Sequence, residues 1–151
     1  MKLESMALVV ALLAGALPVA QADREVFDVS NPVYRDECGS CHVPYPPQLL
    51  SKTSWRAIMA GLDRHFGSDA SLDAKAARDI QAFLDANASR RAASGEPRLR
   101  ITESAWFKRE HDEVPASVWK SPAVNSAANC GACHTQADRG DYSERTLRVP
   151  K

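Results

Sequence analysis

CGSCH (residues 38–42) and CGACH (residues 130–134) spell nearly the same five residues at positions 92 apart, 130 − 38. They contain all four cysteines of the 151-residue chain and two of its four histidines. In C-x-x-C-H, two thiols one helical turn apart can add to the two vinyl groups of one porphyrin, and the next residue lies under the iron. The repeats therefore predict two covalently attached c-type haems. The expected attachment residues are Cys38, Cys41, Cys130 and Cys133, and the expected proximal ligands are His42 and His134.

Paired cysteines also occur in disulfides and in zinc sites. A disulfide within C-x-x-C is typical of redox-active thiols that follow a β-strand, and neither pair here follows a convincing strand. It would also leave both trailing histidines unexplained. A zinc site would have to join pairs 92 residues apart, whereas zinc-ribbon pairs lie much closer in sequence. Both alternatives account for fewer residues than two haems do.

Residues 1–22 have the features of an export signal. Lys2 gives a weakly basic start, an apolar run extends from Met6 to Leu17, and residues 20–22 form an Ala-x-Ala cleavage site. The run is too short to cross a bilayer, which takes about 20 residues. An uncleaved N-terminal anchor is the alternative. We expect cleavage after Ala22, which leaves 151 − 22 = 129 residues, and a periplasmic location, since c-type haem is attached outside the bacterial cytoplasm.

The charge of the chain is balanced. It has 19 basic and 19 acidic residues, and 18 of each remain once the signal is removed. A neutral chain gives no electrostatic reason to expect nucleic acid as a partner. No other apolar run approaches the length of a membrane span, so we expect none in the mature chain.

His65 and His111 are the two histidines left for the distal faces of the irons. Residues 53–67 predict a helix that stops at Gly67 and carries His65 beside an apolar stripe. Met59, the one methionine of the mature chain, lies within that stripe and competes with His65 as a ligand, although its place in the stripe favours core packing. The stripe consists of Trp55, Met59, Leu62 and Phe66.

Residues 101–114 predict a second helix, which starts at Thr102 as N-cap and ends at Pro115. Phe107 and His111 share one face of this helix. The simplest assignment is two histidine ligands at each iron. We pair His65 with His42 and His111 with His134, because each pair lies in one half of the chain. A crossed pairing stays open.

The pattern of helices predicts an all-α fold with two haem domains, residues 23–95 and 96–151. A short helix delivers the first motif, and a closing helix capped by Ser71 has its apolar face at Leu72, Ala76, Ile80, Phe83 and Leu84. Residues 88–98 read as a linker. The last 54 residues, 98–151, are too few to bury a sizeable core without a haem. The expected lining of that haem is Trp106, Phe107, Val118 and Trp119, and the polar tail 138–151 is expected to wrap the surface.

Three stretches resemble the small bacterial dihaem cytochromes c of photosynthetic and facultative proteobacteria. They are CGSCHVPYPP (38–47), LDRHFGSDASLD (62–73) and ITESAWFKREHDEVPASVWKSPAVNSAANCGACHTQADRGDYSE (101–144). The resemblance implies an N-terminal domain like a class I cytochrome c and a less regular C-terminal domain. It also implies ligation of both haems by two histidines each, at His42, His65, His111 and His134. As partners it implies an oxygen-binding monohaem cytochrome c as electron acceptor and a membrane-bound b-type cytochrome as donor.

Two protein ligands at each iron would leave no position for a substrate. We therefore expect an electron carrier and not an enzyme, with low reduction potentials, since two imidazoles stabilise ferric iron more than a His/Met pair does. Haem propionates could pair with Arg56, Arg64 or Arg109, although a solvated helix face is the alternative role for each. Two other functions stay open: a haem enzyme or gas-binding protein with one displaceable distal ligand, and the small dihaem subunit of a periplasmic reductase.

Overall fold

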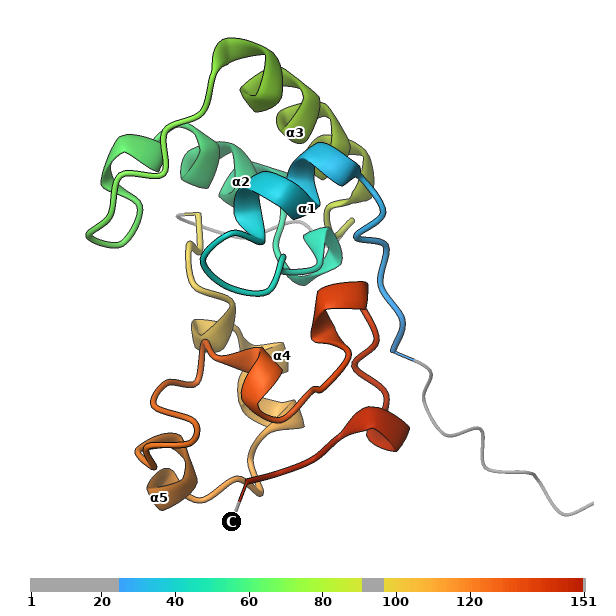
Figure 1. Cartoon of the computed structure of the whole chain (residues 1–151), viewed down its shortest axis with the longest axis vertical. Helices are drawn as coiled ribbons and strands as arrows, with labels where there is room; N and C mark the ends of the chain where they lie inside the picture. Colours follow the sequence, from blue (N-terminus) through green and yellow to red (C-terminus); the bar gives the residue numbers. More distant parts are fainter. Residues whose placement is uncertain (1–24, 91–96, 151) are drawn as a thin grey trace, which may run out of the picture.

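A computed structural model describes residues 25–90 and 97–150 of the chain. The described residues form short helices and 3₁₀ turns joined by loops, with isolated β-bridges but no strand among them. The prediction of an all-α fold is therefore confirmed. The predicted export signal at 1–22 and the predicted domain boundary between 95 and 96 lie outside the described residues. Figure 1 shows α1, α2 and α3 in one lobe and α4 and α5 in the other.

The first lobe consists of three α-helices and two 3₁₀ turns. Each α-helix begins at a polar N-cap whose side chain accepts a backbone N–H: Asn31 from Tyr34, Ser51 from Ser54, and Asp73 from Ala76. Pro32 also favours the start of the first helix, because its ring fixes a helical φ and it lacks the N–H that would stay unpaired there. The elements are α1 (Pro32–Cys38), η1 (Pro47–Leu49), α2 (Lys52–Met59), η2 (Leu62–Arg64) and α3 (Ala74–Asn87).

Two of the expected helices in this lobe have different limits in the structure. The helix expected over 53–67 ends at Met59, and a 3₁₀ turn follows the break at Gly61, a poor helix former. His65 therefore lies just after η2 and not on an apolar helical stripe. The closing helix begins two residues later than expected, since Asp73 and not Ser71 caps it. The Ser71 N–H instead donates to Asp69 in a local turn.

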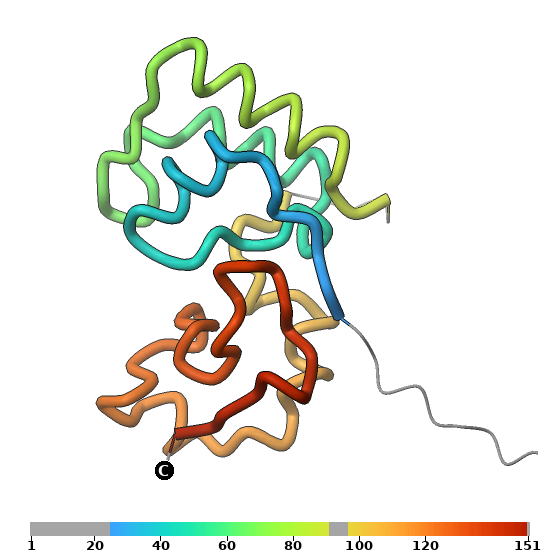
Figure 2. Tube along the Cα trace, turned by 45° about the vertical axis from the view of Figure 1, so that its right-hand side comes forward, coloured from blue at the N-terminus to red at the C-terminus, as the bar shows by residue number. Residues whose placement is uncertain are grey.

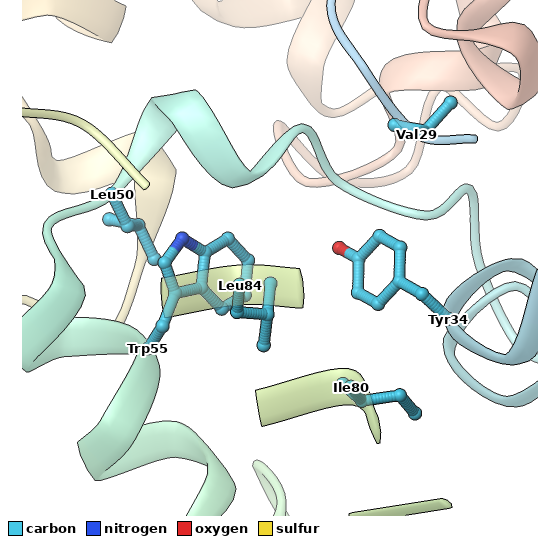
Figure 3. Packing of buried hydrophobic residues seen from close by; sticks show 6 residues of the cluster. All are labelled: Val29, Tyr34, Leu50, Trp55, Ile80 and Leu84. Atoms are coloured by element: carbon cyan, nitrogen blue, oxygen red, sulfur yellow. The ribbon is translucent and has the colours of Figure 1, made fainter. Parts of the chain in front are cut away.

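The hydrophobic core of the first lobe lies where α1 and α2 pack against α3. Trp55 donates its indole N–H to the Pro47 carbonyl at 2.7 Å, and Tyr34 donates its hydroxyl to the Tyr45 carbonyl. These bonds satisfy the polar atoms of two buried aromatic side chains. Figure 3 shows the six residues of the cluster, which are Val29, Tyr34, Leu50, Trp55, Ile80 and Leu84. The predicted face of α3 is confirmed, with Ala76, Ile80 and Leu84 buried and Leu72 and Phe83 packed beside them.

The second lobe is less regular. Its elements are η3 (Ile101–Glu103), α4 (Ala105–Glu110), α5 (Ala116–Trp119), η4 (Cys130–Ala132), η5 (Ala137–Arg139) and η6 (Glu144–Thr146). The helix expected over 101–114 is shorter than predicted, because Ser104 and not Thr102 caps α4 and the helix ends at Glu110. Buried hydrophobic residues are few among the described residues after 97, namely Phe107, Val124 and Ala137.

The first described residues run along the second lobe before the chain enters α1 (Figures 1 and 2). The Phe27 N–H donates to the Gly140 carbonyl and the Tyr142 N–H donates to the Glu25 carbonyl, both at 2.9 Å. The ring of Phe27 packs edge-on against Tyr142 with 5.6 Å between centroids. Backbone pairing thus joins the first described residues to the second lobe, so residues before α1 also connect the two lobes.

Gly140 is required at this junction. Its φ is +77°, and a Cβ built on it would lie 2.3 Å from the Phe27 carbonyl oxygen. We expect Gly140→Ala to lower the free energy of unfolding by more than the about 1–3 kcal/mol that such a backbone conformation alone costs a non-glycine residue. Thermal unfolding measures the effect. Gly67→Ala is the matched control, because Gly67 also has a positive φ, +100°, but open space around it. Equal losses for both variants would contradict the close approach.

Candidate functional site

The first C-x-x-C-H motif begins at the end of α1. Cys38 is the last residue of the helix, and the chain then turns through Gly39 so that His42 lies against Tyr45, with 4.5 Å between ring centroids. The Nδ1 of His42 is 2.7 Å from the carbonyl oxygen of Val43. A carbonyl can only accept, so this bond places the proton on Nδ1 and leaves the lone pair on Nε2, as in a metal-ligating imidazole.

His65 lies opposite His42. The two ring centroids are 6.3 Å apart and the ring planes differ by 26°. The 3₁₀ turn η2 and the bond from the His65 N–H to the Leu62 carbonyl position this residue. His65 is thus held by a tight turn, whereas the sequence predicted a helix.

The second motif forms η4, and its histidine faces His111. The ring centroids of His111 and His134 are 6.1 Å apart and their planes differ by 75°. His111 stacks on Phe107 at 4.1 Å, and its Nδ1 is 3.0 Å from the Phe107 carbonyl oxygen. This contact between residues i and i+4 is the predicted one. Trp119 packs beside His111 at 5.8 Å, as expected for the lining of this site.

The spacing of both histidine pairs fits one metal ion between each pair. Two metal–nitrogen bonds of about 2 Å, plus about 1 Å from each nitrogen to its ring centre, separate the centres by about 6 Å. The observed separations are 6.3 Å and 6.1 Å. None of the four cysteines forms a disulfide, so all four are free to attach to a porphyrin. The residues expected at the two sites are therefore brought together as two groups, one in each lobe.

Burial shifts the pKa of one histidine and one cysteine at each site. It lowers the pKa of His65 and of His134, and the neighbouring histidine lowers each further, which favours the neutral imidazole that binds a metal. Burial also raises the pKa of Cys38 and of Cys130 to about 11. Before a haem is attached, these two thiols are therefore protonated near neutral pH, where a thiol is a weak nucleophile.

Tyr45 connects the two groups, and the sequence analysis missed it. Its ring stacks on His42, and its hydroxyl donates to the carbonyl of Ala128 at 2.7 Å, two residues before Cys130. Beside it, a Cβ added to Gly131 would lie 3.3 Å from Val43. The two motifs are thus in contact although they lie far apart in sequence. The run VPYPP after His42 was a usable signal, because prolines on both sides of Tyr45 restrict where its backbone can turn.

The tail of the chain also contributes to the second site. Tyr142 packs against His134 with 5.0 Å between ring centroids, and the Arg148 N–H donates to the Cys133 carbonyl at 2.8 Å. Ser143 is buried. The tail therefore encloses the second motif as well as covering the surface, which its polar composition did not indicate.

Other residues considered from the sequence have contacts apart from the histidine pairs. Met59 is packed against the core cluster, as its place in the apolar stripe predicted. Trp106 lines a small pocket of about 220 Å³ together with Phe27 and Leu49, and so faces the first lobe. The three arginines considered for propionates each pair with a carboxylate, at 2.7 Å for Arg56–Asp85, 3.5 Å for Arg64–Asp63 and 2.9 Å for Arg109–Glu110. In the described ranges, no helix has the length and apolar character needed to span a membrane.

Comparison with known proteins identifies the family. The family model for dihaem cytochrome c matches residues 34–142, a range that includes both motifs and both facing histidines. The chain belongs to the dihaem cytochrome c family. Two c-type haems are therefore its cofactors, and the cysteine pairs 38/41 and 130/133 fit their attachment. Dihaem cytochromes c are electron carriers and are typically exported.

Solved structures of this family resemble the chain over nearly their full length. A diheme cytochrome c from Rhodobacter sphaeroides is 42% identical, with a TM-score of 0.70 over 78% of this chain and 99% of that one. A diheme cytochrome type c from Shewanella baltica is 41% identical, with a TM-score of 0.71 over 80% of this chain and 93% of that one. The cytochrome c-like fold expected from the sequence is confirmed. A comparison with curated proteins gives no significant match.

Proposed function

We propose that this dihaem cytochrome c is a periplasmic carrier that relays single electrons through two haems, each with two histidine ligands. His42 and His65 would bind the first iron, and His134 and His111 the second. The observation that carries this proposal is the spacing of the two imidazole pairs, 6.3 Å and 6.1 Å between ring centroids. With both axial positions filled, the sites would pass electrons without binding a substrate.

The haems supply iron that changes between the ferric and ferrous states, and the chain controls how readily it does so. The Nδ1 contacts of His42 and His111 with backbone carbonyls, at 2.7 Å and 3.0 Å, fix the orientation of these rings. Such bonds also make an imidazole a stronger donor, which stabilises ferric iron. Low potentials at both haems follow from this ligand set.

Tyr45 provides a short route between the two sites. Its ring stacks on His42 of the first site, and its hydroxyl is bonded to Ala128 next to the second motif. Burial raises the pKa of Tyr45 to about 12, so the phenol keeps its proton and this bond at physiological pH. Electrons entering at either haem could therefore equilibrate within the molecule before they leave it.

The resemblance to the family implies the direction of electron flow and the partners. Two low-potential haems suit a carrier that receives electrons from a membrane-bound b-type cytochrome and delivers them to an oxygen-binding monohaem cytochrome c. The apolar run and Ala-x-Ala site at 6–22 support delivery to the periplasm by a cleaved export signal.

Carbon monoxide tests whether both irons have two firm protein ligands. We expect the reduced protein to show no prompt shift of the Soret band when the gas is added, because ferrous iron with both axial positions filled has no site for it. A protein denatured and reduced under the same conditions is the positive control. A prompt shift in about half of the haem would instead favour a gas-binding protein with one displaceable ligand.

A further inference from the structure

Phe66, which directly follows His65, has an unusual backbone conformation. Its φ is +49°, in the left-handed region that bulky side chains rarely adopt. Gly67 follows with φ +100°, and the Ser68 N–H closes the turn on the His65 carbonyl at 3.0 Å. Two successive residues with positive φ are typical of a type I′ turn, where Asn, Asp and Gly are preferred. Because Phe is poorly suited to this backbone conformation, we expect its ring to form contacts that offset the strain.

The ring of Phe66 lies between His65 and an arginine of the other lobe. It meets the imidazole of His65 edge-on, with 4.9 Å between centroids and 66° between planes. The guanidinium carbon of Arg100 lies 4.2 Å from the centroid of the Phe66 ring. Arg100 immediately precedes η3 and also approaches Glu103 at 3.8 Å, so it belongs to the second lobe.

We propose that Phe66 is a positioning residue for the distal ligand of the first haem, and that Arg100 holds it in place from the second lobe. The cation over the ring face fixes the ring, and the ring fixes His65. This inference rests on the proposed function, in which His65 is a ligand. If it holds, the position of the His65 side chain depends on contact between the two lobes. The half-exposed Phe66 is thus part of the site and not a stray apolar side chain.

The rate at which His65 dissociates from the iron measures directly how firmly Phe66 and Arg100 hold it. Carbon monoxide in excess captures the reduced first haem only when the ligand has dissociated, so a slow rate that is independent of gas concentration reports the dissociation. Phe66→Asn removes the ring and places in the turn a residue that tolerates positive φ. We expect it to speed capture about three- to tenfold, as the loss of an aromatic contact implies. Arg100→Gln should speed capture about two- to fivefold.

Three further variants complete the test. Phe66→Tyr keeps the ring and should match the parent protein. Arg64→Gln removes a guanidinium beside His65 in sequence. The Arg64 side chain is 83% exposed and forms a salt bridge with Asp63, so this variant should also match the parent. The double variant Phe66→Asn with Arg100→Gln should be no faster than Phe66→Asn alone, because Arg100 acts through the ring. An effect of Arg100→Gln that persists without the ring would overturn the proposal.

The proposal and the function on which it rests fail differently. Parent-like capture by Phe66→Asn, in a protein whose two haems are both low-spin, would overturn the role of Phe66 alone. Prompt capture by the unmodified protein would overturn the ligation by two histidines instead. The capture spectrum of His65→Ala identifies the contribution of the first haem in all of these measurements.

Discussion

Replacement of His111 by alanine is expected to convert the second haem from low-spin to high-spin iron and to open it to carbon monoxide. In the described residues, the ring centroid of His111 lies 6.1 Å from that of His134, and the rings of Phe107 and Trp119 pack against His111. Met59, which could replace a lost ligand, is partly buried and packs against the core cluster of the other lobe. The iron would therefore keep one protein ligand, and about half of the total haem should change its spectrum.

Low-temperature EPR of the oxidised variant and gas binding by the reduced variant measure this change. His65→Ala should produce the same change at the first haem, and the two single variants should add up in the double variant, since the histidine pairs occupy separate lobes. Met59→Leu is the control, because it keeps the packing volume and removes the competing sulfur. An unaltered spectrum for His111→Ala would show that His111 is not a ligand.

Removal of the second pair of thiols is expected to cost the chain one haem and the order of its second lobe. Cys130 begins η4 and Cys133 directly follows it. The loops on either side have little core of their own, since Phe107, Val124 and Ala137 are the buried hydrophobic residues described in this lobe. A lobe with so few buried side chains depends on its cofactor for stability, as small metal-binding domains do. Mass spectrometry of the variant with both cysteines changed to alanine should show one haem fewer.

Hydrogen exchange measures the accompanying loss of structure. Protection should fall throughout 97–150 in this variant and remain in α3, where Ile80 and Leu84 belong to a core cluster that needs no second haem. The matching change of Cys38 and Cys41 removes the other haem and should leave more residual protection, because that lobe keeps its six-residue cluster. Equal loss of order in both variants would contradict the difference in core between the lobes.

The sequence predicted the composition of both sites better than the segments that build them. Counting the histidines left His65 and His111 as the candidate distal ligands, and each was paired with the motif in its own half of the chain. The structure places the same pairs of rings about 6 Å apart, and their ligation to iron stays a prediction. The supporting helices were predicted too long, because apolar spacing continued past Gly61 to Phe66 while the backbone did not. The break falls at Gly61, a poor helix former, and the spacing of apolar residues does not report its effect.

Contacts between segments far apart in sequence could not be predicted either, because the spacing of residues within one segment does not report them. Tyr45 reaches Ala128 across 83 residues, and Phe27 reaches Gly140 at the other end of the chain. Neither contact has a local signature beyond a proline-flanked tyrosine and a glycine in a polar tail. The role of Tyr142 beside His134 was hidden likewise, because the polar residues around it indicated an exposed tail.

Low-temperature EPR of the oxidised, unmodified protein tests the ligation of both irons most directly. We expect all of the iron to be low-spin and to give two different low-spin signals, one from each haem. The imidazole planes at the first site differ by 26° and those at the second by 75°. Nearly parallel rings act on the iron along one direction and give a rhombic signal, whereas nearly perpendicular rings give a more anisotropic one. A high-spin ferric signal from about half of the iron would contradict the account, because one haem would then lack its second histidine.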